Sequence, residues 1–326
     1  MAMATQTRSV QPQRRDEQPG SNEMMVRPRV EAAEQIIGMK FPVLQHGFVT
    51  LVDYMGDDNA IVQAARVSYG MGTKSVRDDA GLIRYLMRHR HTTPFEMVEA
   101  KLLVKLPIYV ARQWIRHRTA SVNEYSARYS VVPDLFEIPR EEHIMGQSRT
   151  NRQGREGELP GETRKWFQEE ASRIARDSYR VYSEALGKGI SRETARTVLP
   201  VSTYTEWYWK INLHNMFHFL SLRMDPHAQI EIREYANIIG DEIVGRIAPV
   251  AYSAFKDFTL NSVSLSSKEK TAVSLLLREE PDVERACQLA GLRLRKEDGT
   301  PMKTGEGVEF VQKLKGISER SSGIFA

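Results

Sequence analysis

The sequence contains very little cysteine and no long apolar run. Among its 326 residues the one cysteine is Cys287, which excludes an internal disulfide and a metal centre built from several thiolates. No stretch approaches the roughly 18 consecutive apolar residues that a membrane-spanning helix needs, so we expect no contact with a membrane. Such sparing use of cysteine favours a reducing, cytoplasmic environment.

The chain also lacks a strong excess of charge of one sign. Its 46 basic and 42 acidic residues give a net charge of +4, which is no reason to expect a nucleic-acid partner. The hydrophobic share of 41% and the charged share of 27% are typical of a globular protein. The length suffices for one large domain or two smaller ones.

The usual glycine-rich nucleotide-binding motifs are missing. The segment Gly70-Met71-Gly72 has no third glycine at the spacing of a dinucleotide fingerprint, and no Gly-x-x-x-x-Gly-Lys-Ser/Thr run occurs. Any phosphate group must therefore be bound mainly by side chains.

Composition divides the chain into three parts. Residues 1–26 are polar, without the apolar core of a signal peptide, and we expect a disordered tail. Residues 27–262 form the predicted catalytic domain, in which the polar segment 141–165 is expected to be a mobile surface insertion. Residues 263–326 alternate short apolar runs with charge and predict a helical extension.

Hydrophobic spacing predicts two strands among many helices, which indicates an α/β or α+β fold. The strands are expected at 48–52 and 95–106. Helices are expected at 60–67, where Asp57 and Asp58 offer a cap, and at 82–87, after Asp78 and Asp79. Further helices are expected at 107–116, 165–186, 191–199, 203–223 and 228–246.

The residues best suited to chemistry lie at 113–130, which reads QWIRHRTASVNEYSARYS. Guanidinium groups at Arg116, Arg118 and Arg128 match phosphate oxygens in a bidentate way. Asn123 and Glu124 can contact a base edge or sugar hydroxyls. The segment favours a pocket for a phosphorylated heterocyclic molecule, although a solvent-exposed helix end followed by a polar loop explains it equally well.

The predicted helix 203–223 carries further polar side chains. Asn212 and Arg223 are eleven residues apart and would share a face, while His214 and His218 are four apart. The histidine pair lacks a third ligand at a convincing spacing, so we expect no metal site. The aromatic residues of this segment are expected in the core or at a subunit interface rather than against a cofactor: Trp207, Trp209, Phe217 and Phe219.

These motifs together resemble one enzyme family. The pattern Arg116-His117-Arg118-x-x-Ser121-x-Asn123-Glu124-x-Ser126-x-Arg128-Tyr129-Ser130 resembles the signature of the flavin-dependent thymidylate synthases. Segments at 91–96, 193–200 and 222–231 resemble flanking motifs of that family, and the likeness spans residues 45–250.

The resemblance implies an activity and an assembly. The family methylates dUMP reductively to dTMP, for de novo dTTP biosynthesis, with methylene-tetrahydrofolate as carbon donor and NADPH as reductant through bound FAD. The resemblance also implies a fold and an assembly: a mixed sheet with flanking helices, in a homotetramer whose active sites are shared between subunits.

The resemblance also assigns residues by position. The residues expected around dUMP are Gln113, Arg116, Glu124, Ser126, Ala127, Arg128 and Arg196, with Arg223 from a neighbouring chain. The residues expected around FAD are Thr93, Arg116, His117, Arg118, Glu124, Asn212, His214 and His218. Secondary candidates are His91, Glu96, Asn123 and His227.

The expected catalytic residue is Arg223, which would stabilise the uracil ring ionised at N3. Attack by a cysteine is not expected, because Cys287 lies far outside the matched segment. Ser126 is interpreted as a phosphate contact rather than a nucleophile. Two other functions stay open: a nucleic-acid-binding module using the Arg-His-Arg clusters, and a flavoprotein of the same fold without synthase activity.

Overall fold

The computed structural model describes residues 28–67, 79–149, 154–278, 282–296, 298–303 and 306–322. Five strands form one sheet in the order β1-β2-β3-β7-β4. Their bounds are Phe41–Val43 (β1), Gly47–Met55 (β2), Glu99–Pro107 (β3), Tyr204–Asn212 (β7) and Ser121–Glu124 (β4). All neighbouring pairs are antiparallel. The predicted α+β class with flanking helices is confirmed, whereas the predicted mixed sheet is wrong.

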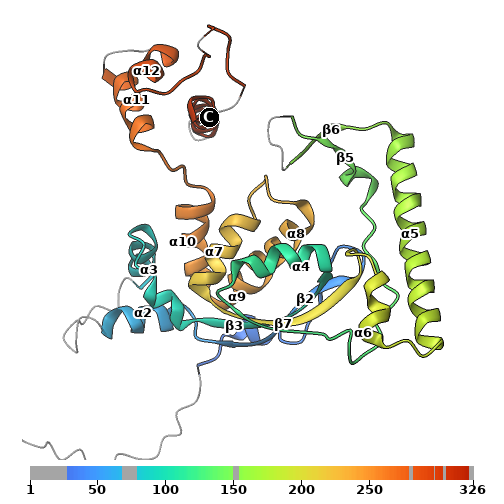
Figure 1. Cartoon of the computed structure of the whole chain (residues 1–326). Coiled ribbons are helices and arrows are strands. Elements are labelled where there is room, and N and C mark those ends of the chain that lie inside the picture. The colour runs from blue at the N-terminus through green and yellow to red at the C-terminus, as the bar shows by residue number, and fades with distance from the viewer. Residues whose placement is uncertain are drawn as a thin grey trace, which may run out of the picture.

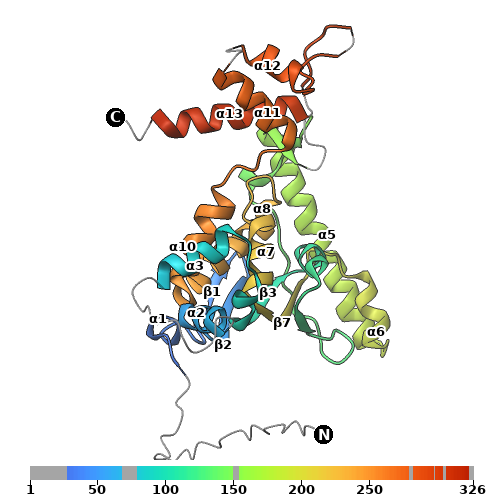
Figure 2. The same ribbon diagram turned by 90° about the vertical axis from the view of Figure 1, so that its left-hand side faces the viewer.

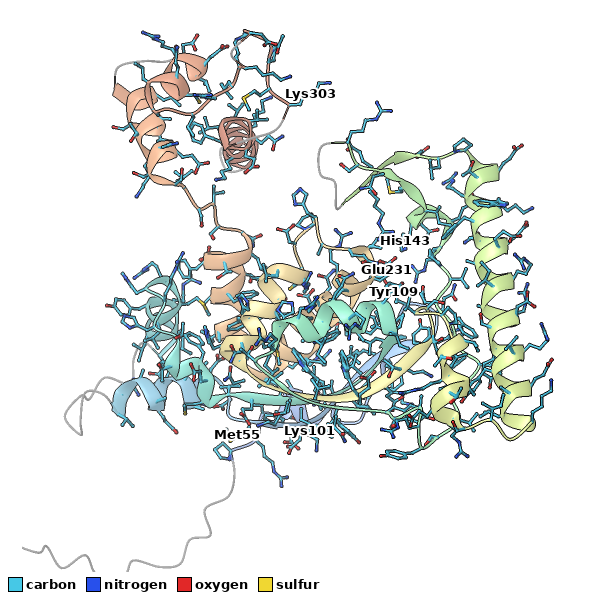
Figure 3. All side chains as sticks on the ribbon, in the orientation of Figure 1. Met55, Lys101, Tyr109, His143, Glu231 and Lys303 are labelled. Carbon is cyan, nitrogen blue, oxygen red and sulfur yellow. The ribbon has the colours of Figure 1, made fainter. Side chains whose placement is uncertain are left out.

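The antiparallel arrangement fits a sheet with helices on one face. Along β7 the side chains of Trp207, Trp209 and Ile211 are buried, whereas Tyr208 between them is exposed. Figure 3 shows Met55 and Lys101 pointing away from the helices. Antiparallel sheets tolerate one open face, while parallel sheets are covered on both.

Helices α4 (Ile108–Trp114), α7 (Leu213–Arg223) and α8 (Ile230–Ile238) lie over the covered face (Figure 1). Trp114 lies at the centre, with its ring 4.6 Å from that of Phe219 and 5.1 Å from that of Trp209. Trp207, Trp209, Phe217 and Phe219 are all buried, which confirms their predicted place in the core.

The remaining elements surround this centre. The α-helices are α1 (Glu31–Glu34), α2 (Asp58–Val67), α3 (Asp79–Arg88), α5 (Gly161–Gly187), α6 (Arg192–Ala195), α9 (Gly245–Ile247) and α10 (Pro249–Phe255). Short 3₁₀ helices lie at Thr93–Met97, Ile115–His117, Glu141–His143 and Arg196–Val198, and π-helical turns at Ile239–Val244 and Lys256–Leu260.

The predicted cap of α2 is present. Asp57 Oδ1 accepts a hydrogen bond from the Ala60 N–H at 3.0 Å. The Asp58 carboxylate accepts the N–H groups of Val250 and Ala251, each at 2.9 Å, and so joins α2 to the first turn of α10. Asp78, the other predicted cap, lies outside the described residues.

The predicted helix 203–223 is wrong in its first half. Residues 204–212 form β7, which lies between β3 and the edge strand β4, and α7 begins at Leu213. Their alternating burial suits a strand with one covered face, which overrides the helical interpretation. The predicted strand 95–106 begins only at Glu99, because residues before it form the 3₁₀ helix Thr93–Met97, with Pro94 in its first turn.

The polar segment 141–165 contains regular structure. Strands β5 (Met145–Gln147) and β6 (Arg155–Glu158) pair antiparallel, and α5 starts at Gly161. An ion pair of 3.1 Å joins Arg155 to the buried Glu231 of α8. This two-stranded sheet is therefore attached to the main body, and its expected mobility stays a prediction.

Beyond α10, three helices form the predicted extension (Figures 1 and 2). They are α11 (Ser267–Arg278), α12 (Val283–Leu289) and α13 (Glu306–Ser322). They enclose a small core of their own, made of Ala272, Cys287, Leu292 and Phe310.

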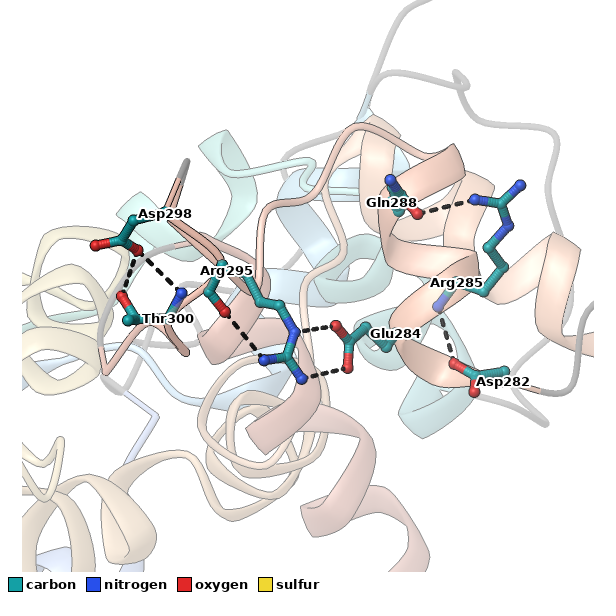
Figure 4. Close-up of polar contacts among 8 residues, drawn as sticks. Asp282, Glu284, Arg285, Gln288, Arg295, Asp298 and Thr300 are labelled. Carbon is teal, nitrogen blue, oxygen red and sulfur yellow. Dashed lines mark hydrogen bonds and ion pairs between the residues drawn. The ribbon is translucent and has the colours of Figure 1, made fainter.

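Polar contacts link the parts of the extension to one another. The Arg295 guanidinium pairs with Glu284, and Asp282 caps α12 at the Arg285 N–H (Figure 4). The predicted tail 1–26 lies outside the described residues. In the part of the chain that is described, no helix has the length and apolar character needed to cross a bilayer.

Candidate active site

The first group of site residues lies where α4 ends. After Trp114 the chain tightens into the 3₁₀ helix Ile115–His117, and Arg118 then adopts a left-handed conformation with φ of 67°. A non-glycine residue rarely does so. The conformation turns the chain towards β4 and leaves Arg116 and Arg118 exposed, with His117 half-buried.

Arg223 approaches the same point from the end of α7. Its Nε donates a hydrogen bond to His117 Nε2 over 2.9 Å. The His117 ring lies edge-on to Phe219, with centroids 4.9 Å apart, and 5.9 Å from the ring of His218. We call Arg116, His117, Arg118, His218 and Arg223 the arginine–histidine group.

Electrostatics in this group disfavour further positive charge. Burial, followed by the charges of Arg223 and His218, lowers the pKa of His117 to about 4. Burial also lowers the pKa of Arg223. At neutral pH His117 is consequently an uncharged imidazole, whose Nε2 can accept the hydrogen bond from Arg223 Nε.

Three predicted flavin residues lie at the other end of α7. Asn212 Oδ1 caps the helix by accepting the Asn215 N–H at 2.9 Å. His214 is half-buried in the first turn. Thr93 begins a 3₁₀ helix that packs against α7 through the rings of Phe95 and Phe217, 6.2 Å apart.

The second group begins at Glu124, the last residue of β4. Glu124 Oε1 accepts a hydrogen bond from Thr205 Oγ1 at 2.7 Å. Ser126 Oγ accepts the Arg128 N–H at 3.3 Å, and the Arg128 side chain pairs with Glu193 at 2.8 Å. We call Glu124, Ser126, Ala127, Arg128 and Arg196 the serine–arginine group.

Ala127 and Arg196 complete the serine–arginine group. Ala127 packs against the apolar cluster around Tyr182 and Ala195. Arg196 follows Ala195 directly and is exposed. Within the described residues, no carboxylate pairs with Arg196. Its charge is therefore free to meet an anion.

Along the chain, the strand β4 lies between Arg118 of the arginine–histidine group and Ser126 of the serine–arginine group. At about 3.3 Å per residue the ends of this strand, Ser121 and Glu124, are about 10 Å apart. All four residues are exposed on the edge of the sheet.

Gln113 lies in the last turn of α4, just before the arginine–histidine group in the chain, and its amide donates to Gln229 Oε1 beside α8. Gln229 also lines a cavity of about 1550 Å³ whose walls include Arg155, Asp225, Lys303 and Lys313.

The secondary candidates make local contacts. The His91 ring stacks on Tyr85 with centroids 5.9 Å apart. His227 Nδ1 lies 2.9 Å from Asp225 Oδ1. Asn123 is exposed on β4, and Glu96 is half-buried in the 3₁₀ helix after Thr93.

Several residues that matter here were not predicted as site residues: Glu193, Thr205 and Gln229. Glu193 and Gln229 stood inside motifs that resembled the family, so a signal existed for both. Thr205 came from the segment interpreted as helix, where no signal marked it.

The single thiol of the chain lies outside this site. Cys287 is buried in the core of the extension, and burial raises the pKa of its thiol, which disfavours the nucleophilic thiolate. Across the described ranges, no cluster of three or more histidine, cysteine, aspartate or glutamate side chains could hold a metal ion.

Comparisons with known proteins agree with the motifs. A sequence model of the family described as "Thymidylate synthase complementing protein" matches residues 50–250. The "Flavin-dependent thymidylate synthase" of Gluconobacter oxydans (strain 621H) is 55% identical over 244 residues, covering 74% of this chain and 80% of that relative.

The chain belongs to the flavin-dependent thymidylate synthase family. A flavin-dependent thymidylate synthase of Ruegeria pomeroyi is 53% identical over 265 residues, which cover 78% of this chain and 85% of the relative. Among solved structures, the UMP/dUMP methylase PolB from Streptomyces cacaoi bound with 5-Br dUMP matches with a TM-score of 0.61 and 35% identity. That match covers 67% of this chain and 98% of PolB. The predicted family is confirmed.

Proposed function

We propose that this chain is a flavin-dependent thymidylate synthase that converts dUMP to dTMP. Methylene-tetrahydrofolate supplies the carbon, and NADPH supplies reducing equivalents through FAD. The observation that carries this proposal is the 55% identity over 244 residues with the Gluconobacter oxydans enzyme of that name.

The residues present fit a flavin dinucleotide. Its diphosphate needs cationic donors, and Arg116 and Arg118 are exposed with no carboxylate pairing with them among the described residues. His117 and His218 would offer hydrogen-bonding groups nearby. Glu124 would do so from the end of β4, and Asn212, His214 and Thr93 from the other end of α7. When bound, FAD would supply the hydride for C6 of the uracil ring.

The serine–arginine group suits the phosphate of dUMP. Arg128 and Arg196 would neutralise it, and Ser126 would donate its hydroxyl hydrogen. The Arg128–Glu193 ion pair is exposed, with side-chain exposures of 53% and 61%. Such pairs contribute at most about 1 kcal/mol, so a phosphate can replace Glu193 at little cost.

Arg223 would stabilise the ionised uracil ring. Its guanidinium has no carboxylate partner among the described residues, so its full charge is available to an anion at N3. Each unit by which it lowers the pKa of that imide corresponds to about 1.4 kcal/mol. Gln113 would contact the nucleotide from the adjoining turn of α4.

We further propose a homotetramer in the cytoplasm, with sites shared between subunits. The separation of the two groups by β4 supports this, because a second chain could bring its arginine–histidine group to the serine–arginine group of the first. Exposed side chains at Val122, Tyr125, Tyr129 and Tyr208 supply apolar area along the same edge. Residues 263–326 would be an appended helical unit.

Tritium release from 5-labelled dUMP tests the activity. Purified protein should be yellow from bound flavin, bind dUMP, and release tritium only when NADPH and methylene-tetrahydrofolate are supplied. Arg223→Ala should lower the release rate by about a hundredfold or more, as expected for loss of a charged transition-state contact, while retaining flavin.

Other results would overturn the proposal. A yellow protein without tritium release would indicate a flavoprotein that has lost synthase activity. A colourless protein with strongly salt-dependent binding to nucleic acid would favour a nucleic-acid-binding module.

A further inference from the structure

The hydrogen-bond partner of Arg223 is a histidine and not a carboxylate. We propose that His117 is a positioning residue for Arg223, holding its Nε so that both terminal amino groups face the substrate. The proposal rests on the function proposed above and adds a role to a residue otherwise assigned to the flavin.

The geometry leaves the recognition edge of the guanidinium free. Arginine has five N–H donors in a planar fork. The one on Nε is occupied by His117 Nε2 at 2.9 Å. In the part of the chain that is described, no other side chain bonds to Arg223, so its four terminal N–H groups are available.

The uncharged partner matters for the chemistry. A carboxylate would orient Arg223 equally well, but it would neutralise the charge that must stabilise an anionic ring. Arg128 of the serine–arginine group differs in this respect, because it pairs with the carboxylate of Glu193. His117 orients the guanidinium and leaves its charge intact.

The surroundings of His117 keep it in the accepting form. Its ring is packed edge-on against Phe219, and the charged or titratable groups facing it are Arg223 and His218. Arg116 and Arg118 flank it on its own turn. Its pKa is lowered to about 4, so the contact should persist at neutral pH and be lost as pH falls through that value.

A double-mutant cycle on the FAD-loaded enzyme tests the coupling. His117→Ala should weaken dUMP binding about tenfold, the scale of a hydrogen bond to a charged group. His117→Gln should stay within about threefold of wild type, because its amide oxygen can still accept from Arg223. In an Arg223→Ala background, His117→Ala should weaken binding no further.

The cycle separates this role from flavin binding. Flavin content is measured for each variant, and dUMP affinity is compared at saturating FAD. Additive losses of affinity would overturn the proposal, as would a His117→Gln variant as weak as His117→Ala. If wild type itself fails to bind dUMP, the proposed function fails; a normal wild type with an additive cycle removes only the positioning role.

Nitrogen NMR of wild-type enzyme labelled in histidine provides a readout without variants of His117. At pH 6 its ring should be neutral with the proton on Nδ1, and Arg223→Ala should raise its apparent pKa towards the ordinary value. A doubly protonated ring at pH 6 would overturn the proposal.

Discussion

Two arginines of the candidate site are held by partners of different charge. Arg128 lies in an exposed ion pair with Glu193, whereas Arg223 donates to an uncharged His117. The first arrangement suits an arginine that exchanges its carboxylate for an incoming phosphate, since the exposed pair is weak. The second suits an arginine whose charge must act undiminished on the reacting ring.

Ser126 provides a test of the difference between binding and covalent chemistry. In the described part of the chain no histidine contacts its hydroxyl, so nothing would activate it as a nucleophile. We expect Ser126→Ala to raise the KM for dUMP about tenfold through one lost bond to a charged phosphate, with kcat largely retained.

Tritium-release kinetics would measure both constants. Ser253→Ala, the same change at an exposed position of α10, serves as the matched control and should leave both unchanged. Loss of kcat by a factor of a thousand with dUMP still bound would show that Ser126 takes part in the chemistry.

Single side chains could be proposed as site residues where their own chemistry marks them, and their roles stay predictions. The arginines and Ser126 could be proposed from residue type at 113–130, whereas the flavin role of the histidines came from the family resemblance. Their partners could not be named in the same way. Thr205 and Gln229 reach Glu124 and Gln113 only through the fold, and sequence separation hides such contacts.

The junction of β7 and α7 shows how one element was misjudged. Residues 203–223 contain no proline or glycine, so the apolar run favoured a single helix. Burial alternates along Trp207, Tyr208 and Trp209, a period that indicates a strand. The one local signal of a boundary was Asn212, a residue that favours helix N-caps.

Edge strands β1 and β4 were not predicted at all. β4 is exposed at every position, so it has no hydrophobic pattern to read. Its conformation depends on pairing with β7 across the sheet, from Ser121 opposite Lys210 to Glu124 opposite Trp207. Such long-range pairing lies beyond any local pattern in the sequence.

Asn212→Ala tests the role of the cap at the level of the element. Losing the side-chain acceptor for the Asn215 N–H should lower the free energy of unfolding by about 1 kcal/mol, measured by thermal or denaturant unfolding without FAD. Asn212→Ser should retain most of that stability because serine also caps.

The two substitutions also separate capping from flavin binding. If Asn212 touches FAD, Asn212→Ser should lose flavin affinity while keeping its stability. Equal stability of Asn212→Ala and wild type would contradict the capping role.

At the scale of the whole molecule, the exposed β4 edge of the sheet and the large exposed side chains near it need an explanation. Tyr208 is 42% exposed and Tyr129 is 78% exposed, although both are large and partly apolar. An unpaired edge strand is also a liability that proteins usually cover. A second copy of the chain packed against this region would bury the exposed tyrosines and cover the β4 edge. It would also join the arginine–histidine group of one chain to the serine–arginine group of the other.

Co-expression of two inactive variants tests this shared site. Arg223→Ala damages the arginine–histidine group, and Arg128→Ala damages the serine–arginine group, so each alone should show little tritium release. If each site takes one group from either of two chains, random co-assembly leaves about a quarter of the sites with both groups intact, since symmetric oligomers repeat the same interface. Co-expressed enzyme should therefore recover about a quarter of wild-type activity.

The double variant Arg128→Ala/Arg223→Ala, co-expressed with wild type, supplies the matched control. Absence of any recovery in a co-assembled oligomer would place both groups of each site within one chain.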